Sequence, residues 1–507
     1  MEPQNIKFGG GVPVTIVNPL VLVVILIAGV VIFFAARKQA IAAFLTAGIL
    51  VPTDHVINIA GVHFPMLRVL TLFGFARILW KSLSRGEPLF SGGVNAIDKA
   101  LIVLATFTAI DGMLLWRVSA EVVYQLGYLY TTFGVYFLVR HLIRDKEDVR
   151  RAVQVLACVT IVIAGIMIYE AITGRNVLYA VLGGARSYMQ QAGERDDRMR
   201  AAGSFAHPIL AGTFGGFMLP LFAGFWVKDR RTRTLMGLGI IGTLVMGITA
   251  NSSTALIGLL AGTGALCCWP LRRHMRAIRW GIILTLAGGQ MYMKSPVWHI
   301  ISDIDLAGGS SSFHRYLLVD KCIQHFSDWA LVGTKDYASW GWDMWDLSNQ
   351  YVWTADTAGL IPLIAFLAVI VFGFKLLGKM RCIAETTSDR KEEFLVWAIA
   401  ASLFANVIAF LGIDYFDQII VGWYALLAII ATVTLSVRSA GSIQEGALVG
   451  STEGVFHPVL APSDPSKKQA RNVKTEPFGQ ERTVVQSRTT SMGRLLPNML
   501  DPIRQAT

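Results

Sequence analysis

Charged residues are scarce in this chain of 507 residues. They make up 16% of the sequence, whereas an ordinary soluble domain carries about a quarter. Hydrophobic residues make up 54%, and the mean hydropathy is +0.53. A bilayer-spanning helix needs about 20 mostly apolar residues, and such runs recur between Val14 and Val437. The composition therefore argues against a water-soluble enzyme and predicts an all-α polytopic membrane protein.

The sequence also lacks the motifs of soluble cofactor enzymes. It has no CxxC, HExxH or Walker A motif, and no GxGxxG beside a strand–helix unit. No two histidines and a carboxylate have the spacing of metal ligands, so we expect no metal site and no cofactor. Of the five cysteines, only Cys322 is expected on the outer side of the membrane, which excludes an intrachain disulfide there.

The apolar residues fall into thirteen candidate transmembrane segments, or twelve if the short second segment pairs with the third as a re-entrant element. Their approximate bounds are 14–36, 39–52, 64–80, 98–116, 121–139, 152–172, 208–226, 234–250, 254–270, 280–293, 354–377, 394–413 and 418–437. Basic clusters occupy every second connection, at 37–38, 81–85, 140–151, 228–233, 272–279 and 379–391. The positive-inside rule predicts that these connections are cytoplasmic. This topology accounts for most of the net charge of +11 and removes the main support for a nucleic-acid partner.

Three regions follow from this pattern. Residues 1–13 form an N-terminal segment, and residues 14–437 form a transmembrane domain with two long outward loops, at about 173–207 and 294–353. Residues 438–507 are rich in Ser, Gly, Gln and Pro, and six of the 17 prolines lie between Pro458 and Pro502. Such a segment buries too little apolar surface to fold, so we expect a disordered cytoplasmic tail.

The first long loop ends in the sequence Arg198-Met-Arg200-Ala-Ala-Gly203-Ser-Phe-Ala-His207-Pro208, at the start of an apolar segment. Arginines beside a helix N-terminus are suited to bind an anion such as phosphate. Arg200 is predicted to bind a ligand in this way. Arg198 either joins it or pairs with the acidic residues at 194, 196 and 197. His207 is either a structural residue at the membrane boundary or a positioning group.

The second long loop contains His314-Arg315 and, further on, Asp346-Leu-Ser348-Asn349-Gln-Tyr351. On a helical wheel Arg315 lies at the edge of an apolar stripe, where an unpaired guanidinium costs several kcal/mol. It is expected to meet either a bound anion or a structural carboxylate from Asp346 or Asp356.

Two arginines occur within the third apolar segment. Arg68 lies at its outward end and could join the same cluster, with Asp111, Glu170 and Asp414 as candidate counter-ions. Arg77 lies close to the inner face and is expected to snorkel toward it.

These blocks together resemble a known family. The run Arg200 to Pro208, the block Asn251-Ser-Ser-Thr-Ala, and the residues His314-Arg315 and Asn349-Gln-Tyr351 are similar to motifs of the O-antigen polymerase and O-antigen ligase superfamily. The motifs cover about residues 196–365, and the topology extends the likeness over 14–437. The Asp-x-x-Asn-x-Tyr form looks more like the exopolysaccharide polymerase branch.

The resemblance implies a GT-C-like fold with 12–13 transmembrane helices in the bacterial cytoplasmic (inner) membrane, with the active site on the periplasmic side. It implies a metal-independent, inverting glycosyltransferase that polymerises undecaprenyl-diphosphate-linked oligosaccharides. Membrane lipid, chain-length regulators and export proteins would be its partners.

The resemblance also assigns roles to residues. Arg200 and Arg315 would hold the diphosphate. Ligases of this superfamily carry His-Asn where this chain has Ser348-Asn349, and since serine cannot act as that base, Asp346 is the candidate base. Further substrate-binding candidates are Arg198, His207, Arg68, His314, Asn349 and Tyr351.

Two alternatives stay open. The first, within the same class, is an O-antigen ligase that transfers a finished glycan to lipid A core. The second is a transporter or flippase of lipid-linked glycans. Transporters usually place their polar sites near the bilayer midplane on broken helices in repeated halves. Here the polar residues gather in two outer loops and no inverted repeat is evident.

Overall fold

The computed structural model describes residues 15–59, 62–183, 194–195, 198–303 and 311–435. The predicted N-terminal segment, 1–13, and the predicted tail, 438–507, lie outside the described residues.

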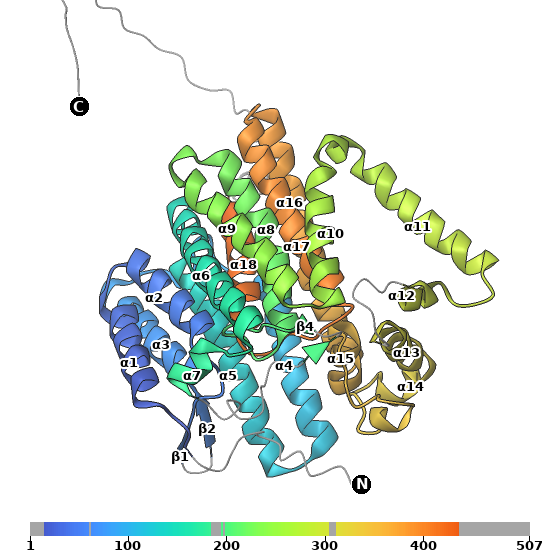
Figure 1. Cartoon of the computed structure of the whole chain (residues 1–507), viewed down its shortest axis with the longest axis horizontal. Helices are drawn as coiled ribbons and strands as arrows, with labels where there is room; N and C mark the ends of the chain where they lie inside the picture. The colour runs from blue at the N-terminus through green and yellow to red at the C-terminus, as the bar shows by residue number, and fades with distance from the viewer. Residues whose placement is uncertain (1–14, 60–61, 184–193, 196–197, 304–310, 436–507) are drawn as a thin grey trace, which may run out of the picture. The chain divides into compact units, whose positions relative to one another are not determined.

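The described chain is almost entirely helical, which confirms the predicted all-α class (Figure 1). Each predicted apolar segment overlaps one long helix. These helices are α1 (Pro19–Phe34), α2 (Arg37–Leu50), α3 (Met66–Arg85), α4 (Ala96–Trp116), α5 (Ser119–Leu142), α6 (Lys146–Thr173), α8 (Pro208–Lys228), α9 (Arg233–Thr249), α10 (Ser253–Cys267), α11 (Met275–Tyr292), α16 (Leu360–Thr386), α17 (Arg390–Ala409) and α18 (Ile419–Val433).

The connections contain shorter elements. The helices among them are α7 (Val177–Leu182), α12 (Ile300–Asp303), α13 (Ser311–Gln324), α14 (Phe326–Trp329) and α15 (Gln350–Ala358). Two small antiparallel hairpins were not expected from the sequence. One pairs β1 (Val56–Ile59) with β2 (Val62–Pro65), and the other pairs β3 (Glu194–Arg195) with β4 (Arg198–Met199).

Several of these helices are long and apolar enough to cross a membrane. Within the described residues seven meet this criterion, namely α4, α5, α6, α8, α9 with its preceding turn, α16 and α17. An eighth span is possible from α10 and the following 269–292, which are bent by 75°. The protein is therefore a multi-pass membrane protein. The other apolar helices are shorter, or like α3 carry several basic residues, and the count of 12–13 spans stays a prediction.

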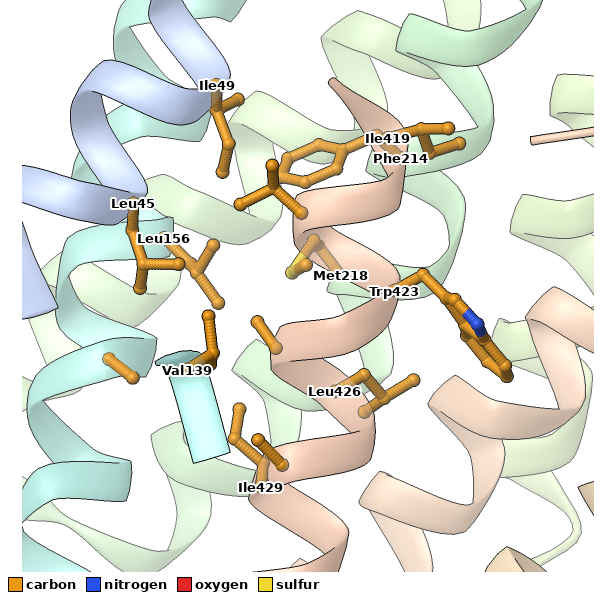
Figure 2. Close-up of a cluster of buried hydrophobic side chains, with 14 of the residues drawn as sticks. Leu45, Ile49, Val139, Leu156, Phe214, Met218, Ile419, Trp423, Leu426 and Ile429 are labelled. Atoms are coloured by element: carbon orange, nitrogen blue, oxygen red, sulfur yellow. The ribbon is translucent and has the colours of Figure 1, made fainter. Parts of the chain in front are cut away.

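Helix α18 lies at the centre of the largest core (Figure 2). Its side chains Ile419, Leu426 and Ile429 are fully buried. They face residues of four other helices, namely Leu45 and Ile49 of α2, Val139 of α5, Leu156 of α6, and Phe214 and Met218 of α8. A helix buried on all sides is apolar all round, which explains why α18 lacks a polar face.

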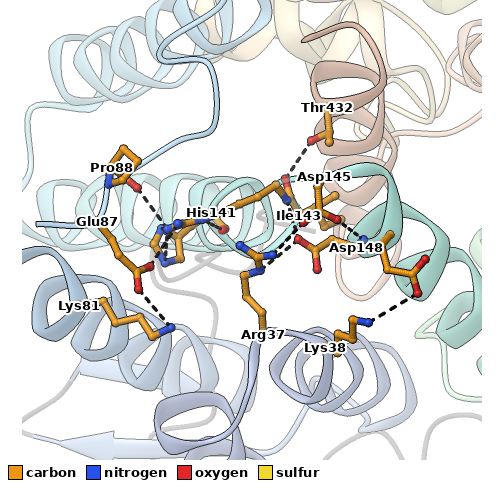
Figure 3. Close-up of polar contacts among 12 residues, drawn as sticks. Arg37, Lys38, Lys81, Glu87, Pro88, His141, Ile143, Asp145, Asp148 and Thr432 are labelled. Atoms are coloured by element: carbon orange, nitrogen blue, oxygen red, sulfur yellow. Dashed lines mark hydrogen bonds and ion pairs between the residues drawn. The ribbon is translucent and has the colours of Figure 1, made fainter. Parts of the chain in front are cut away.

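One end of the helices, here called the basic end, carries the clusters from alternate connections. Arg37 lies 2.9 Å from Asp145 and 3.1 Å from Asp148, and Lys38 lies 3.6 Å from Glu147 (Figure 3). Ion pairs also join Arg150 to Asp229, Lys228 to Glu392, Arg272 to Glu393 and Arg381 to Glu385. The alternation read from the sequence thus corresponds to one physical end of the molecule.

Arg77 does not snorkel to water as expected. Its side chain is 1% exposed and donates to the carbonyl oxygens of Ile32 and Ala35, both at 2.7 Å. These carbonyls lie at the C-terminal end of α1, where the last turn of a helix has no intrahelical donors and attracts positive charge. Arg77 therefore joins α3 to the end of α1.

The opposite end, here called the loop end, carries the second long loop and the connection 410–418. The predicted apolar segment 354–377 is interrupted there, because Gly359, with φ +87°, separates α15 from α16. A Cβ at Gly359 would lie 2.8 Å from the Leu331 carbonyl oxygen. Leu360 N–H donates to the Ala330 carbonyl at 3.0 Å, and this hydrogen bond attaches the loop to the N-terminal end of α16.

Candidate functional site

A second, smaller core builds the site at the loop end. Helix α13 packs against α15 and the turn before it through a separate buried cluster. Its members are Leu318, Cys322, Trp329, Met344, Leu347, Val352 and Ala355. This packing fixes the residues from 314 to 351 that the sequence singled out.

Arg315 and Asp346 come together here from different segments. Arg315 lies on α13 and is only 7% exposed, whereas Asp346 lies exposed on the turn before α15. Partial burial raises the pKa of the Asp346 carboxyl, and the neighbouring side chains of His314 and Arg315 oppose that rise. A buried cation therefore lies within electrostatic reach of an accessible carboxylate with a raised pKa.

Asp414 belongs to the same group of charges. Burial raises its pKa to about 6, and the negative charges of Asp346 and Asp417 add to the rise. The sequence suggested Asp414 as a counter-ion of Arg68, but its electrostatic neighbours include Asp346, the candidate base. The signal that could have revealed this is the short acidic connection from Asp414 to Asp417 between two apolar segments.

The turn after Arg200 is fixed by backbone contacts. Glu170 accepts hydrogen bonds from the N–H groups of Ala202 and Gly203 at 3.1 and 2.9 Å, and Asn176 donates to the Gly203 carbonyl at 2.7 Å. Glu170 thus shapes this turn, and it is not an ion-pair partner of Arg68. Arg200 itself is half-buried.

The block Asn251-Ser-Ser-Thr254 lies between contacts to the first long loop and to the connection 410–418. On one side, Ala201 N–H donates to the carbonyl of Thr249, just before the block, at 3.0 Å. On the other side, Thr254 Oγ1 donates to the Gly412 carbonyl at 3.2 Å. A Cβ added at Gly412 would lie 3.2 Å from Arg315 Nε, so Arg315 packs against Gly412. Thr254 and Arg315 therefore meet at Gly412, and the segment after Arg200 contacts the chain just before the same block.

Four predicted substrate-binding residues hold the backbone of the site. His207 Nδ1 accepts from Ile209 N–H at 3.2 Å and caps α8. Asn349 is fully buried, and its Oδ1 accepts from the first N–H groups of α15 at 3.0 and 3.2 Å. Tyr351 OH donates to the Val407 carbonyl at 2.9 Å, and His314 Nε2 donates to the Asp343 carbonyl at 3.0 Å. These side chains position the segments that carry Arg315 and Asp346.

Arg198 lies in β4 opposite Arg195. Its neighbours at 196 and 197 lie outside the described residues, so both predictions for Arg198 stay open.

Arg68 lines a cavity of about 470 Å³ at the loop end, and Asp414 lines it too. The wall is largely apolar and aromatic, with Phe366, Phe410 and Trp423 among its residues. Arg68 Nε donates to Thr131 Oγ1 at 2.9 Å and Nη1 to the His63 carbonyl at 2.8 Å. Among the described residues no carboxylate lies within ion-pair distance of Arg68. The cavity therefore suits an apolar molecule with an anionic group.

Comparison with known proteins adds no further identification. No protein-family model matches the chain, and no curated protein matches it at a significant level. The resemblance to the O-antigen superfamily rests on the motifs alone.

Proposed function

We propose that this protein joins lipid-diphosphate-linked oligosaccharide units into a polysaccharide on the outer face of the bacterial cytoplasmic membrane. The observation that carries the proposal is the meeting of Arg315 and Asp346 at the loop end of a multi-pass membrane protein. A glycosyl transfer from a diphosphate requires a cation for the leaving group and a carboxylate for the incoming hydroxyl.

The reaction proceeds as a single displacement. The hydroxyl oxygen of the acceptor sugar forms a bond to the anomeric carbon of the donor, and its proton passes to the Asp346 carboxylate. The bond between the anomeric carbon and the diphosphate oxygen breaks, and that oxygen keeps the electron pair. Arg315 and Arg200 stabilise the developing charge. One displacement at the anomeric carbon inverts its configuration.

The surroundings of the two residues suit these roles. Arg315 is buried, and a charge acts more strongly on a neighbouring anion where little water screens it. Asp346 is accessible, and a raised pKa makes its carboxylate a better proton acceptor. The negative charge of Asp343 adds to the raised pKa of Asp346.

The neighbouring cavity supports a lipid-linked substrate. Its aromatic wall suits an isoprenoid chain, and Arg68 supplies a cation at that wall. A soluble sugar nucleotide would gain nothing from such a lining, because burial of apolar surface requires an apolar ligand.

The decisive experiment uses the full-length protein in liposomes with an undecaprenyl-diphosphate-linked repeat unit. The proposal expects a ladder of products, each one repeat longer than the last, with an inverted anomeric linkage by NMR. A single transfer to lipid A core would instead identify a ligase. Movement of the lipid-linked glycan across the bilayer without a new glycosidic bond would identify a flippase. Either of these results would overturn the proposal.

A further inference from the structure

Two large aromatic side chains are exposed on the turn that leads to Asp346. Trp342 is 67% exposed and Trp345 is 71% exposed. Single exposed hydrophobic residues are common on protein surfaces. These two tryptophans lie three positions apart, the second adjacent in sequence to the candidate base, and are here called the aromatic surface. The catalytic roles above do not use them.

The turn that presents these rings is held firmly. Met344 and Leu347 are buried in the smaller core, one on each side of Trp345 in the sequence. His314 Nε2 donates to the Asp343 carbonyl at 3.0 Å, and Asp346 N–H donates to the same carbonyl at 3.2 Å. The backbone is therefore fixed before a ligand arrives, which lowers the entropy cost of binding.

His314 also contacts one of the rings. Its imidazole lies edge-on to Trp342, with ring centroids 6.5 Å apart. Because His314 precedes Arg315 on α13, the aromatic surface and the buried cation belong to one packed unit.

The charges around the two tryptophans select the class of ligand. The segment from Lys335 to Asp346 contains one lysine and three aspartates. Anionic lipid surfaces attract basic segments and repel a segment with an excess of carboxylates. The same carboxylates also repel phosphates. Carboxylates accept hydrogen bonds from hydroxyl groups, and indole rings pack against apolar C–H surfaces. A sugar offers both of these surfaces at once.

We infer that Trp342 and Trp345, with Asp343, form a glycan-binding platform that holds the acceptor oligosaccharide beside Asp346. The identification of the bound glycan as the acceptor rests on the proposed function. The binding of a lipid-free oligosaccharide to the platform does not rest on it, so the platform and the polymerase activity can fail in separate experiments.

The test measures binding without catalysis. Oligosaccharides are released by mild acid from the lipid-linked fraction of the cells that make this protein, so that the probe carries no lipid and no diphosphate. Their binding to the full-length protein in detergent is measured by calorimetry. We expect Trp342→Ala and Trp345→Ala each to weaken binding by about three- to tenfold, and Trp345→Phe to retain most of it.

Trp280→Ala serves as the matched control, because Trp280 is similarly exposed on α11, outside the site. It should bind as the wild type does. The inference is overturned if the wild type binds none of these oligosaccharides, or if both alanine variants bind them as tightly as the wild type. Binding with no elongation in liposomes would overturn the proposed polymerase and leave the platform standing.

The competing role for the two rings is insertion into the membrane interface. Brominated phospholipids quench tryptophan fluorescence on contact. If the quenching per tryptophan is the same in the wild type and in the Trp342→Ala/Trp345→Ala double variant, the result agrees with the platform. Selective loss of quenching in the double variant, with unchanged oligosaccharide binding, would place the rings in the bilayer and overturn the inference.

Discussion

Arginines at the two ends of this molecule have different surroundings. At the basic end Arg273 lies 2.9 Å from Glu385 with 67% of its side chain exposed, and Arg37 pairs with two aspartates. An exposed pair such as Arg273 with Glu385 contributes about 0–1 kcal/mol. At the loop end Arg315 is almost fully buried. A charge acts more strongly on a neighbouring anion where little water screens it, so an anionic substrate would gain most at the loop end.

Burial alone does not identify a site. Arg77 and Arg140 at the basic end are also buried. Arg77 satisfies helix carbonyls, and Arg140 lies 3.7 Å from the buried carboxylate of Asp98. Arg315 differs because its carboxylate neighbour, Asp346, is accessible and has a raised pKa. A buried arginine that contacts only buried structural groups, such as Arg77 or Arg140, is therefore no indication of a site. A buried arginine beside an accessible carboxylate, such as Arg315, is a candidate for one.

The largest effect that this comparison predicts is that of Arg315→Ala. Removal of a preorganised charge from a leaving group typically lowers the rate by about 10²–10³-fold. We expect the initial rate of chain elongation in liposomes to fall by about that factor. Arg273→Ala, at the exposed basic end, should leave the rate within about twofold.

Equal rates for Arg315→Ala and the wild type would show that the buried arginine is structural. Arg315→Lys retains the positive charge but lacks the planar guanidinium, so its elongation rate should lie between those of Arg315→Ala and the wild type.

The second prediction concerns Asp346→Asn. A general base typically contributes at least about 10²-fold, and we expect a loss of that order in the elongation rate. Since burial raises the pKa of Asp346 and the base must be ionised, the wild-type rate should increase with pH through that pKa. This limb of the profile should be absent in Asp346→Asn. The exposed Asp328→Asn should keep both the rate and the profile, and a wild-type rate independent of pH would exclude Asp346 as the base.

A smaller effect should follow from Gly412→Ala. The added Cβ would lie 2.7 Å from Thr254 Oγ1 and 3.2 Å from Arg315 Nε, so both side chains must shift. Overpacking of this kind typically costs about 1–3 kcal/mol, and we expect elongation to fall by about tenfold. Gly264→Ala is the matched control, because nothing lies within 4 Å of its added Cβ. If both variants elongate equally, the packing of Arg315 against Gly412 is not needed for activity.

The smallest predicted effect is on stability, through Asp356 in α15. Burial raises its pKa to about 7, and a hydrogen bond from the Cys322 thiol opposes the rise. The folded state therefore holds a proton that the unfolded state releases near pH 4. The contribution of Asp356 to stability is greatest below that pH and declines as the pH rises to about 7.

Asp356→Asn removes this decline. Its Tm should exceed that of the wild type by a few degrees at pH 8, with no gain at pH 4, as measured by thermal unfolding in detergent. Asp328→Asn should show no gain at pH 8. A Tm difference between Asp356→Asn and the wild type that does not grow from pH 4 to pH 8 would contradict the role given to Asp356.

Much of the fold could be predicted from the sequence, because apolar length alone selects membrane helices. Each predicted segment overlaps a long helix, and the alternating basic clusters gather at one end. The break at Gly359 was missed, since apolar residues continue through it and only the contact with Leu331 shows why a glycine is needed. Arg77 was misread because the carbonyls that it binds belong to a helix more than 40 residues earlier.

The candidate site could be predicted only as residue types in two loops. Asn349, Tyr351 and His207 were predicted to bind substrate, but the contacts that the structure gives them are caps of helix ends and an anchor on a distant carbonyl. The neighbourhood of Asp346 and Asp414 could not be predicted, because they are separated by a full pair of apolar helices.

By itself the sequence determined the helical class, the approximate helix bounds and the division of charge between alternate connections. These properties follow from local apolar length and from the cost of placing charge in a bilayer. The tertiary structure alone decided which charges are buried and which meet. Packing of α13 on α15, and of Thr254 on Gly412, places Arg315 beside Asp346, since long-range contacts set solvent exposure and the distances between charges.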